Sequence, residues 1–223
     1  MKEKSLTKGE LYESRFGFRE RNSNFCFLLV VVLILCSFFI VRYHFVSHYG
    51  GIVVSGSSMR ETLHNGDKLF MRFTDEEHKA DRGDVIVVYV GDYPECSDVK
   101  GGYLIKRLIA KENDRVKCVN GRISVWYSGG TGWEPLEEDY AYYGERNAYQ
   151  TQYDFAEYTV GEGEIFFLGD NRSSAGSSKD SRYLEGKSHL TGLYKETDIV
   201  GYVPKWSLYN KWLGDIFLSD EIA

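Results

Sequence analysis

The chain has 223 residues, enough for one sizeable domain with or without an anchor. Hydrophobic residues make up 43% and charged residues 27%, which excludes a wholly disordered chain, and three prolines beside 23 glycines exclude collagen-like and proline-rich sequence. The formal charge of −6 is uneven: residues 1–49 carry seven Lys and Arg against four Asp and Glu, and the rest carry 20 against 29. Since no concentrated basic face is visible, we expect no nucleic-acid partner.

A long apolar run begins at Phe25. Residues 25–41 contain one polar side chain, Ser37, and the apolar character continues to Val46. The run lacks the polar face that a core helix of a soluble protein shows every 3.6 residues. It is also longer than the apolar region of most cleaved secretion signals, and no small-residue cleavage site follows it. The sequence therefore predicts a signal anchor over residues 25–46 that spans the lipid bilayer.

The charges on either side of the run predict its orientation. Six Lys and Arg residues precede the run, whereas only Arg42 closely follows it. An excess of positive charge marks the cytoplasmic side of a membrane helix. We therefore expect residues 1–24 to be a cytoplasmic tail and residues 50–223 to be an extracytoplasmic domain of a single-pass protein of the cell membrane.

The outer part consists of short β runs separated by turn signals. Asn120-Gly121 lies between residues 116–119 and 122–125, which is a strong sequence signal for a hairpin. Residues 126–160 alternate only weakly and predict an inserted, irregular lobe, and only Glu61–Asn65 shows a short helical pattern. The predicted fold is mainly β: a sheet or barrel-like domain behind a single transmembrane helix.

Lys106 lies in an apolar stretch, residues 103–110. The period of two along a strand puts Lys106 on the same face as Leu104, Leu108 and Ala110. A lysine in this place either extends its ammonium to water at a strand edge or is buried. Burial would lower its pKa, and a neutral amine can take the proton from a serine hydroxyl without help from histidine or aspartate.

Ser58 is the serine with the best setting for such a partner. It ends the small-residue loop Ser55–Ser58, directly after an apolar strand, where a substrate backbone can approach closely. The five histidines are scattered and no His/Cys cluster is present, so we expect no metal and no cofactor. A disulfide between Cys96 and Cys118 remains open, because two cysteines in an exported domain permit it without requiring it.

Four segments, in order behind the anchor, make the chain resemble bacterial type I signal peptidases, the membrane-anchored Ser/Lys proteases that remove signal peptides from exported proteins. These segments are residues 54–63, 82–87, 103–110 and 169–182. The resemblance implies that Ser58, followed by Met59, is the nucleophile and that Lys106 is the general base. A lysine at the base position is similar to the bacterial form and not to the endoplasmic-reticulum form.

The last of these segments implies residues that support the active site. They are Asp170, Asn171, Ser178, Asp180 and Arg182. In the family the serine contacts the base and an Asp/Arg pair shapes the site. Seven residues separate Arg172 from the aspartate where the family usually has four, so Ser174 and Ser177 are alternatives to Ser178. Glu61 stands where the family usually has proline.

The implied substrates are exported preproteins with small residues before the cleavage site. We expect the cleavage region to lie extended near Gly56 and residues 103–105, with main-chain hydrogen bonds giving affinity. An alternative is a catalytically inactive, membrane-tethered β-domain that binds peptides or a partner protein, which Glu61 and the insertion at residues 173–179 favour. Self-cleaving repressors share the Ser/Lys chemistry, but they carry a DNA-binding domain where this chain has its apolar run.

Aromatic residues gather near the C-terminus. Trp206, Tyr209, Trp212 and Phe217 lie within twelve positions of one another. They either pack into the core or contact the membrane interface, where Trp and Tyr are favoured. The sequence leaves both interpretations open.

Overall fold

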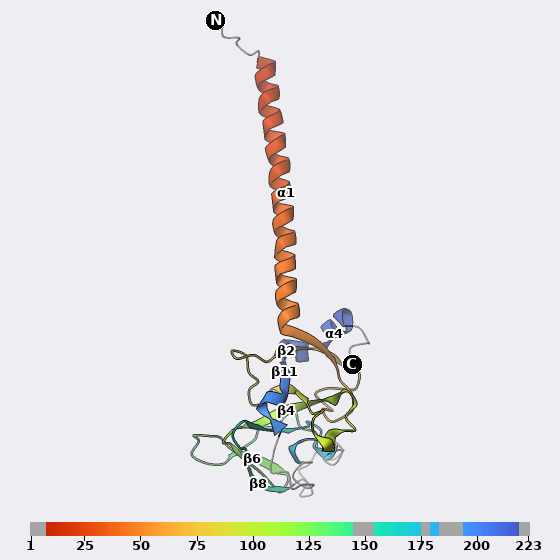
Figure 1. Cartoon of the computed structure of the whole chain (residues 1–223), viewed down its shortest axis with the longest axis vertical. Coiled ribbons are helices and arrows are strands. Elements are labelled where there is room, and N and C mark those ends of the chain that lie inside the picture. The colour runs from red at the N-terminus through yellow and green to blue at the C-terminus, as the bar shows by residue number, and fades with distance from the viewer. Residues whose placement is uncertain (1–7, 145–153, 175–178, 183–193, 219–223) are drawn as a thin grey trace. The chain divides into compact units, whose positions relative to one another are not determined.

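The computed structural model describes residues 8–144, 154–174, 179–182 and 194–218. The chain divides into two compact units, Met1–His48 and Tyr49–Ala223 (Figure 1). The first unit is a helix, and the second contains all the described strands.

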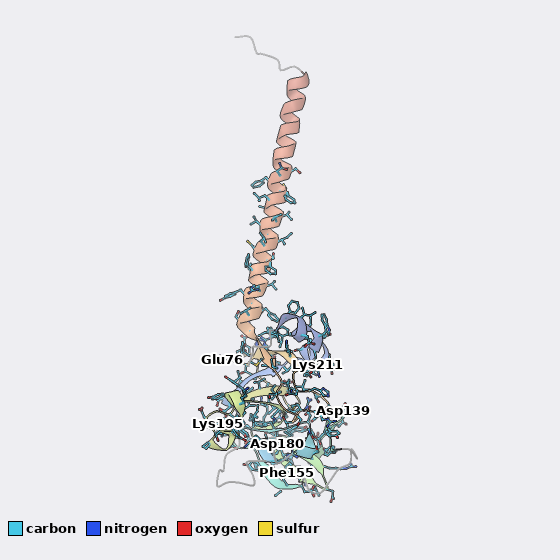
Figure 2. The ribbon with its side chains drawn as sticks, turned by 90° about the vertical axis from the view of Figure 1, so that its right-hand side faces the viewer. Glu76, Asp139, Phe155, Asp180, Lys195 and Lys211 are labelled. Atoms are coloured by element: carbon cyan, nitrogen blue, oxygen red, sulfur yellow. The ribbon has the colours of Figure 1, made fainter. Side chains whose placement is uncertain are left out.

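Helix α1 runs from Lys8 to His48 (Figure 1). Its segment Ser23–His48 contains an 18-residue window with a mean hydropathy of 2.9 and no buried residue, and the segment is long and apolar enough to cross a membrane. Side chains project from this segment on all sides (Figure 2), and the apolar run forms no polar stripe. The helix extends beyond residues 25–46 at both ends.

Seven strands of the second unit form an antiparallel sheet in the order β1-β2-β11-β3-β4-β9-β10. Their β-branched and aromatic residues suit a pleated, buried surface. The strands are β1 Tyr49–Val53, β2 Lys68–Phe73, β3 Val85–Tyr89, β4 Tyr103–Lys111, β9 Glu164–Leu168, β10 Tyr194–Lys195 and β11 Ile199–Val203. The prediction of a mainly β fold is confirmed.

A smaller antiparallel sheet has the order β7-β6-β5-β8. Its strands are β5 Arg115–Val119, β6 Arg122–Trp126, β7 Glu134–Pro135 and β8 Phe155–Thr159. The predicted hairpin is present as β5 and β6, and Asn120 and Gly121 both take positive φ, 54° and 73°, as its two-residue turn requires. Among the described residues of the region 126–160, β7 and β8 pair with this hairpin.

The described helices of the second unit are short. They are η1 Pro94–Cys96, η2 Lys100–Gly102, η4 Arg172–Ser174, η5 Glu196–Asp198, α3 Lys205–Tyr209 and α4 Lys211–Phe217. The short helical pattern at Glu61–Asn65 does not form a helix. This stretch forms turns instead, in which the N–H groups of Thr62 and Leu63 donate to the Met59 carbonyl. Glu61 has φ 77°, which interrupts a right-handed helix.

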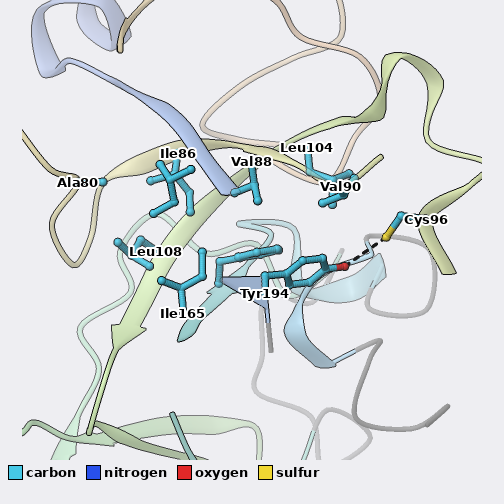
Figure 3. Close-up of a cluster of buried hydrophobic side chains, with 11 residues drawn as sticks. Ala80, Ile86, Val88, Val90, Cys96, Leu104, Leu108, Ile165 and Tyr194 are labelled. Atoms are coloured by element: carbon cyan, nitrogen blue, oxygen red, sulfur yellow. Dashed lines mark hydrogen bonds between the residues drawn. The ribbon is translucent and has the colours of Figure 1, made fainter. Parts of the chain in front are cut away.

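The buried apolar side chains form three clusters. One packs around Tyr194 (Figure 3), whose hydroxyl lies 3.3 Å from the Cys96 sulfur. Cys118 belongs to a second cluster, under the small sheet, and neither cysteine forms a disulfide. The structure therefore has no Cys96–Cys118 disulfide. The third cluster holds Met59 and Leu63 beneath the loop that carries Ser58.

Candidate active site

Ser58 sits on a tight turn after β1. The Gly56 N–H donates to the Asn65 side-chain oxygen at 2.9 Å, and Gly56 has φ 91°, a left-handed conformation that glycine adopts without strain. Met59 and Leu63 are almost fully buried and hold the turn against the core. Ser58 itself stays partly exposed, so its hydroxyl is open to a ligand.

Lys106 reaches this hydroxyl from the middle of the large sheet. Its ammonium nitrogen Nζ lies 2.7 Å from Ser58 Oγ and 3.0 Å from the Ile105 carbonyl oxygen. The side chain does not extend to water, because Lys106 is only 2% exposed. Burial removes the ammonium from water and lowers the pKa of Lys106 from 10.5 to about 8, although the carboxylates of Asp180 and Asp170 act in the opposite direction.

Asp170 is a fully buried carboxylate that ties β4 to the turn of Ser58. Arg107 donates to it in a fork, with Nε at 2.8 Å and Nη2 at 2.6 Å, and the Thr62 hydroxyl donates at 2.5 Å. Such paired, charge-assisted hydrogen bonds fix orientation more firmly than single contacts. Arg107, the residue of β4 that follows Lys106, is therefore connected through Asp170 to the turn that Lys106 contacts.

Asn171 bonds directly to the backbone of the same turn. Its N–H donates to the Ser58 carbonyl at 2.9 Å, and its side-chain amide donates to the Ser57 carbonyl at 3.0 Å. Gly169 approaches so closely that an added Cβ would lie 2.5 Å from the Ser58 carbonyl oxygen. The segment after β9 thus holds the turn of Ser58 through its backbone carbonyls. A residue larger than glycine at position 169 would require the backbone to move.

Asp180 and Arg182 form an ion pair behind this segment. Arg182 donates through Nε at 3.1 Å and Nη2 at 2.7 Å, and the Gly169 N–H lies 3.3 Å from the same carboxylate. Asp180 is fully buried within the body of the domain (Figure 2). Ser178 and Ser177 lie outside the described residues, and Ser174 ends the short helix η4.

Sequence reasoning did not select Arg107 or Thr62 as site residues. Arg107 carries a usable signal, because it is a charged residue inside an apolar strand and needs a buried partner. Thr62 carries no such signal, since its role depends on a hydrogen bond to a residue 108 positions away. Among the described residues, no group of three or more His, Cys, Asp or Glu side chains is placed to hold a metal ion.

A cavity of about 840 Å³ opens beside Ser58. Its walls include Gly51–Met59 and Tyr103–Lys106, and Asp98–Gly101 and Lys179 also line it. β1 is the outermost strand of its sheet, and among the described strands β9 pairs with β4 only from Arg107 onward. Both walls therefore present strand edges that an extended peptide can pair with.

Comparison with known proteins shows the family of this chain. Residues 24–207 match the family described as signal peptidase, peptidase S26. The chain belongs to this family. The match covers the apolar helix and nearly all of the domain described above, so the chain is a peptidase of the group that removes signal peptides.

Curated relatives are similar over most of their length. Signal peptidase I of Bacillus licheniformis is 27% identical over 78% of this chain and 87% of its own. A probable signal peptidase I-1 of Synechocystis is 27% identical over 85% of this chain and 82% of its own. A crystal structure of a signal peptidase I from Enterococcus faecalis is 25% identical and matches 57% of this chain and 98% of its own, with a TM-score of 0.39.

Proposed function

We propose that the chain cleaves signal peptides from exported preproteins with Ser58 as the nucleophile and Lys106 as the general base. The observation that carries the proposal is the 2.7 Å separation between a buried lysine nitrogen and the serine hydroxyl. With a pKa of about 8, roughly one-tenth of the lysine is neutral at pH 7. That fraction is sufficient for a base that acts near its own pKa.

In this mechanism Ser58 attacks the scissile carbonyl carbon while Lys106 takes the hydroxyl proton. The same lysine then delivers the proton to the leaving amine and activates the water that hydrolyses the acyl-enzyme. The backbone N–H of Ser58 is the donor that we assign to the developing oxyanion. Asp170, Asn171, Asp180 and Arg182 support the reaction by holding the turn and the base in register. Met59 anchors the same turn in the core.

The cavity supports the substrate class. Its lining includes Ile52, Met71, Val87 and Ile105, so it offers an apolar surface to the side chains of an extended cleavage region. The expected substrates are preproteins with small residues before the cleavage site.

Cleavage of a preprotein with an Ala-x-Ala site by the full-length protein in detergent tests the mechanism. Ser58→Ala and Lys106→Ala should each abolish cleavage, and wild-type kcat/KM should rise with pH through one titration near pH 8, because the neutral lysine is the active form. Lys117→Met and Ser124→Ala are matched controls, since this pair lies opposite each other in the small sheet. Both controls should keep wild-type activity.

Two results would contradict the mechanism. Activity that survives Lys106→Ala would remove this lysine as the base. A wild-type protein that binds several preproteins without cleaving any would favour the tethered peptide-binding domain instead.

We also propose that the domain faces the outside of the cell membrane, with residues 1–24 in the cytoplasm. The support is the positive charge before the apolar helix. A protease added to right-side-out vesicles should digest residues 50–223 and leave a protected N-terminal fragment. Digestion of this domain only in inverted vesicles would reverse the assigned orientation.

A further inference from the structure

The segment after β7 leaves the small sheet and returns to the candidate active site. It is still attached to the small sheet at Leu136, whose N–H donates to the Ile123 carbonyl at 2.9 Å. Six residues later, the Tyr142 N–H donates to the Asp170 carbonyl and the Arg172 N–H donates to the Tyr142 carbonyl, each at 2.8 Å. This parallel bridge places residues 138–143, which we call the brace, directly beside the residues that hold Ser58.

The brace contributes one buried charge. The Glu138 carboxylate forms an ion pair with Arg172, and the two side chains are 2% and 1% exposed. The Tyr143 hydroxyl also donates to Glu138 at 2.6 Å. Arg172 in turn donates through Nε to the Gly169 carbonyl at 2.9 Å. Because an unpaired charge is costly in such a place, Glu138 determines where the Arg172 guanidinium lies.

A second contact runs from the brace to β4. The guanidinium of Arg107 lies 3.9 Å from the centre of the Tyr140 ring, in a cation–π arrangement. Arg107 is the residue that forks onto Asp170. The brace therefore contacts both arginines that hold the segment after β9.

We propose that Glu138 is a positioning residue for the Ser58 nucleophile. Glu138 holds Arg172, Arg172 holds the Gly169 carbonyl, and the adjoining Asn171 holds the carbonyls of Ser57 and Ser58. The brace, which does not line the cavity, is thus connected to the turn of Ser58 through Arg172 and the segment after β9. The effect on cleavage rests on the proposed function, whereas the effect on the turn of Ser58 rests only on these hydrogen bonds.

Glu138→Gln in the full-length protein tests the kinetic part. It keeps the shape of the side chain and removes the charge that orients Arg172. Since a misplacement of about 1 Å in a catalytic group can lower a rate by about 100-fold, we expect kcat to fall by about 10- to 100-fold. KM should stay within about 2-fold and the pH midpoint should stay near 8, because the cavity walls and Lys106 are untouched.

The matched control is Glu157→Gln, which breaks an exposed ion pair with Arg115 in the same small sheet. It should leave kcat unchanged. Glu138→Asp keeps the charge and should recover part of the activity that Glu138→Gln loses. Wild-type kcat in folded Glu138→Gln, or equal losses in Glu138→Gln and Glu157→Gln, would overturn the proposal.

Hydrogen exchange of the same proteins gives a readout that does not need cleavage. In Glu138→Gln, peptides covering residues 57–64 and 169–172 should exchange faster while the β3 peptide, residues 85–89, keeps its wild-type protection. Faster exchange in all three peptides would show general destabilisation and overturn a specific role. If the wild type cleaves no preprotein, but only the peptides 57–64 and 169–172 exchange faster in Glu138→Gln, the proposed function fails. The role of Glu138 in holding the turn of Ser58 is then still supported.

A double variant separates positioning from stability. Glu138→Met with Arg172→Met replaces the buried ion pair by apolar side chains, which is often neutral or stabilising for folding. It still removes the Arg172 contact with the Gly169 carbonyl. We expect a folded protein with the same loss of kcat as Glu138→Gln, and a folded double variant with wild-type kcat would overturn the proposal.

Discussion

At Lys106, the requirements of folding and of the proposed chemistry oppose each other. The sheet buries an amine among apolar side chains, and this burial lowers its pKa to about 8. A lowered lysine pKa means that the protonated form is less stable in the folded state than in the unfolded state. The same desolvation that supplies a neutral base therefore destabilises the domain at neutral pH.

Lys106→Met should stabilise the protein while abolishing cleavage. A shift from 10.5 to about 8 corresponds to about 3 kcal/mol, and the lost hydrogen bonds of the lysine offset about 1 kcal/mol. The cost of burying the charge is full below pH 8, the folded pKa, and disappears as pH rises through 10.5, the unfolded pKa. Thermal unfolding should show a net gain of about 2 kcal/mol at pH 7 that shrinks between pH 8 and pH 10.

Lys117→Met is the control for this stability measurement, because Lys117 lies over the Trp133 ring in the small sheet and not in the core of the large one. It should give no pH-dependent gain. A Lys106→Met protein less stable than wild type at pH 7 would mean that its hydrogen bonds outweigh the burial of its charge.

Glu61 shows how one residue changes the turn of Ser58. Its φ of 77° is far from the value of about −65° to which proline is restricted, so a proline does not fit this turn. Glu61→Pro should therefore destabilise the protein and lower cleavage, although it restores the residue usual in the family. Glu61→Gly should raise the free energy of unfolding by about 0.5 kcal/mol or more, since it relieves the left-handed strain.

Glu76→Gly is the matched control, because Glu76 is exposed and is not among the described residues with positive φ (Figure 2). It should be neutral or destabilising in chemical denaturation. A Glu61→Pro protein as stable and as active as wild type would contradict the left-handed turn.

At the scale of elements, β4 shows where alternation holds and where it fails. Leu104 and Leu108 belong to the cluster around Tyr194, as a period of two predicts for the face of Lys106. Ala110 lies instead with Ile109 in the cluster under the small sheet, because the pairing with β9 shifts by one residue between Leu108 and Ala110. A bulge of this kind changes the direction of the side chains that follow it.

The junction of β9 with the turn of Ser58 gives a prediction for Gly169. Gly169→Ala would place a methyl group 2.5 Å from the Ser58 carbonyl oxygen, so the turn must move. We expect kcat to fall by about 10- to 100-fold with a smaller change in KM. Steady-state cleavage kinetics on the folded variant measure this effect.

Gly214→Ala is the control for the cost of crowding alone. Its added Cβ would lie 1.9 Å from the Lys68 carbonyl oxygen, between α4 and β2. It should lower the melting temperature without the specific loss of kcat. Equal activity losses in both folded variants would show that the close contact at Gly169 has no special role.

At the scale of the whole molecule, α3 and α4 present an apolar surface to solvent. Trp206, Tyr209, Trp212, Ile216 and Phe217 are between 37% and 83% exposed, so core packing does not explain them. Such a cluster is unusual on a soluble domain. Tyr49, the first residue of β1, has its ring 5.9 Å from the ring of Trp206.

We expect this surface to contact the membrane interface, and the four tryptophans allow a direct test. Trp126 ends β6 and Trp133 directly precedes β7, and their ring centres are 6.0 Å apart. In vesicles with brominated lipids, fluorescence should be quenched strongly in Trp126→Phe/Trp133→Phe and weakly in Trp206→Phe/Trp212→Phe. Equal quenching in the two double variants would mean that Trp206 and Trp212 lie no closer to the lipid than Trp126 and Trp133. That result would contradict the membrane contact of α3 and α4.

The apolar helix, the mainly β domain and the hairpin at Asn120-Gly121 were determined by the sequence alone. Each depends on patterns that act over a few neighbouring residues: an apolar run, alternation, or two residues that tolerate positive φ. Ser58 and Lys106 were also predicted as site residues, from the small-residue loop, the lysine inside an apolar strand and the resemblance to the family, and their roles stay predictions. The contacts that Asp170 makes with Arg107 and Thr62 were not predicted.

Only the tertiary structure decided which distant side chains meet. Ser58 and Lys106 are 48 positions apart, and Arg107 and Asp170 are 63 apart, so no local pattern relates them. Their contact depends on the order and register of strands, and the buried charges must then find partners within that arrangement. Glu138 and Arg172 are the clearest example. Charged residues are expected at the surface, but the fold buries both side chains and pairs them with each other.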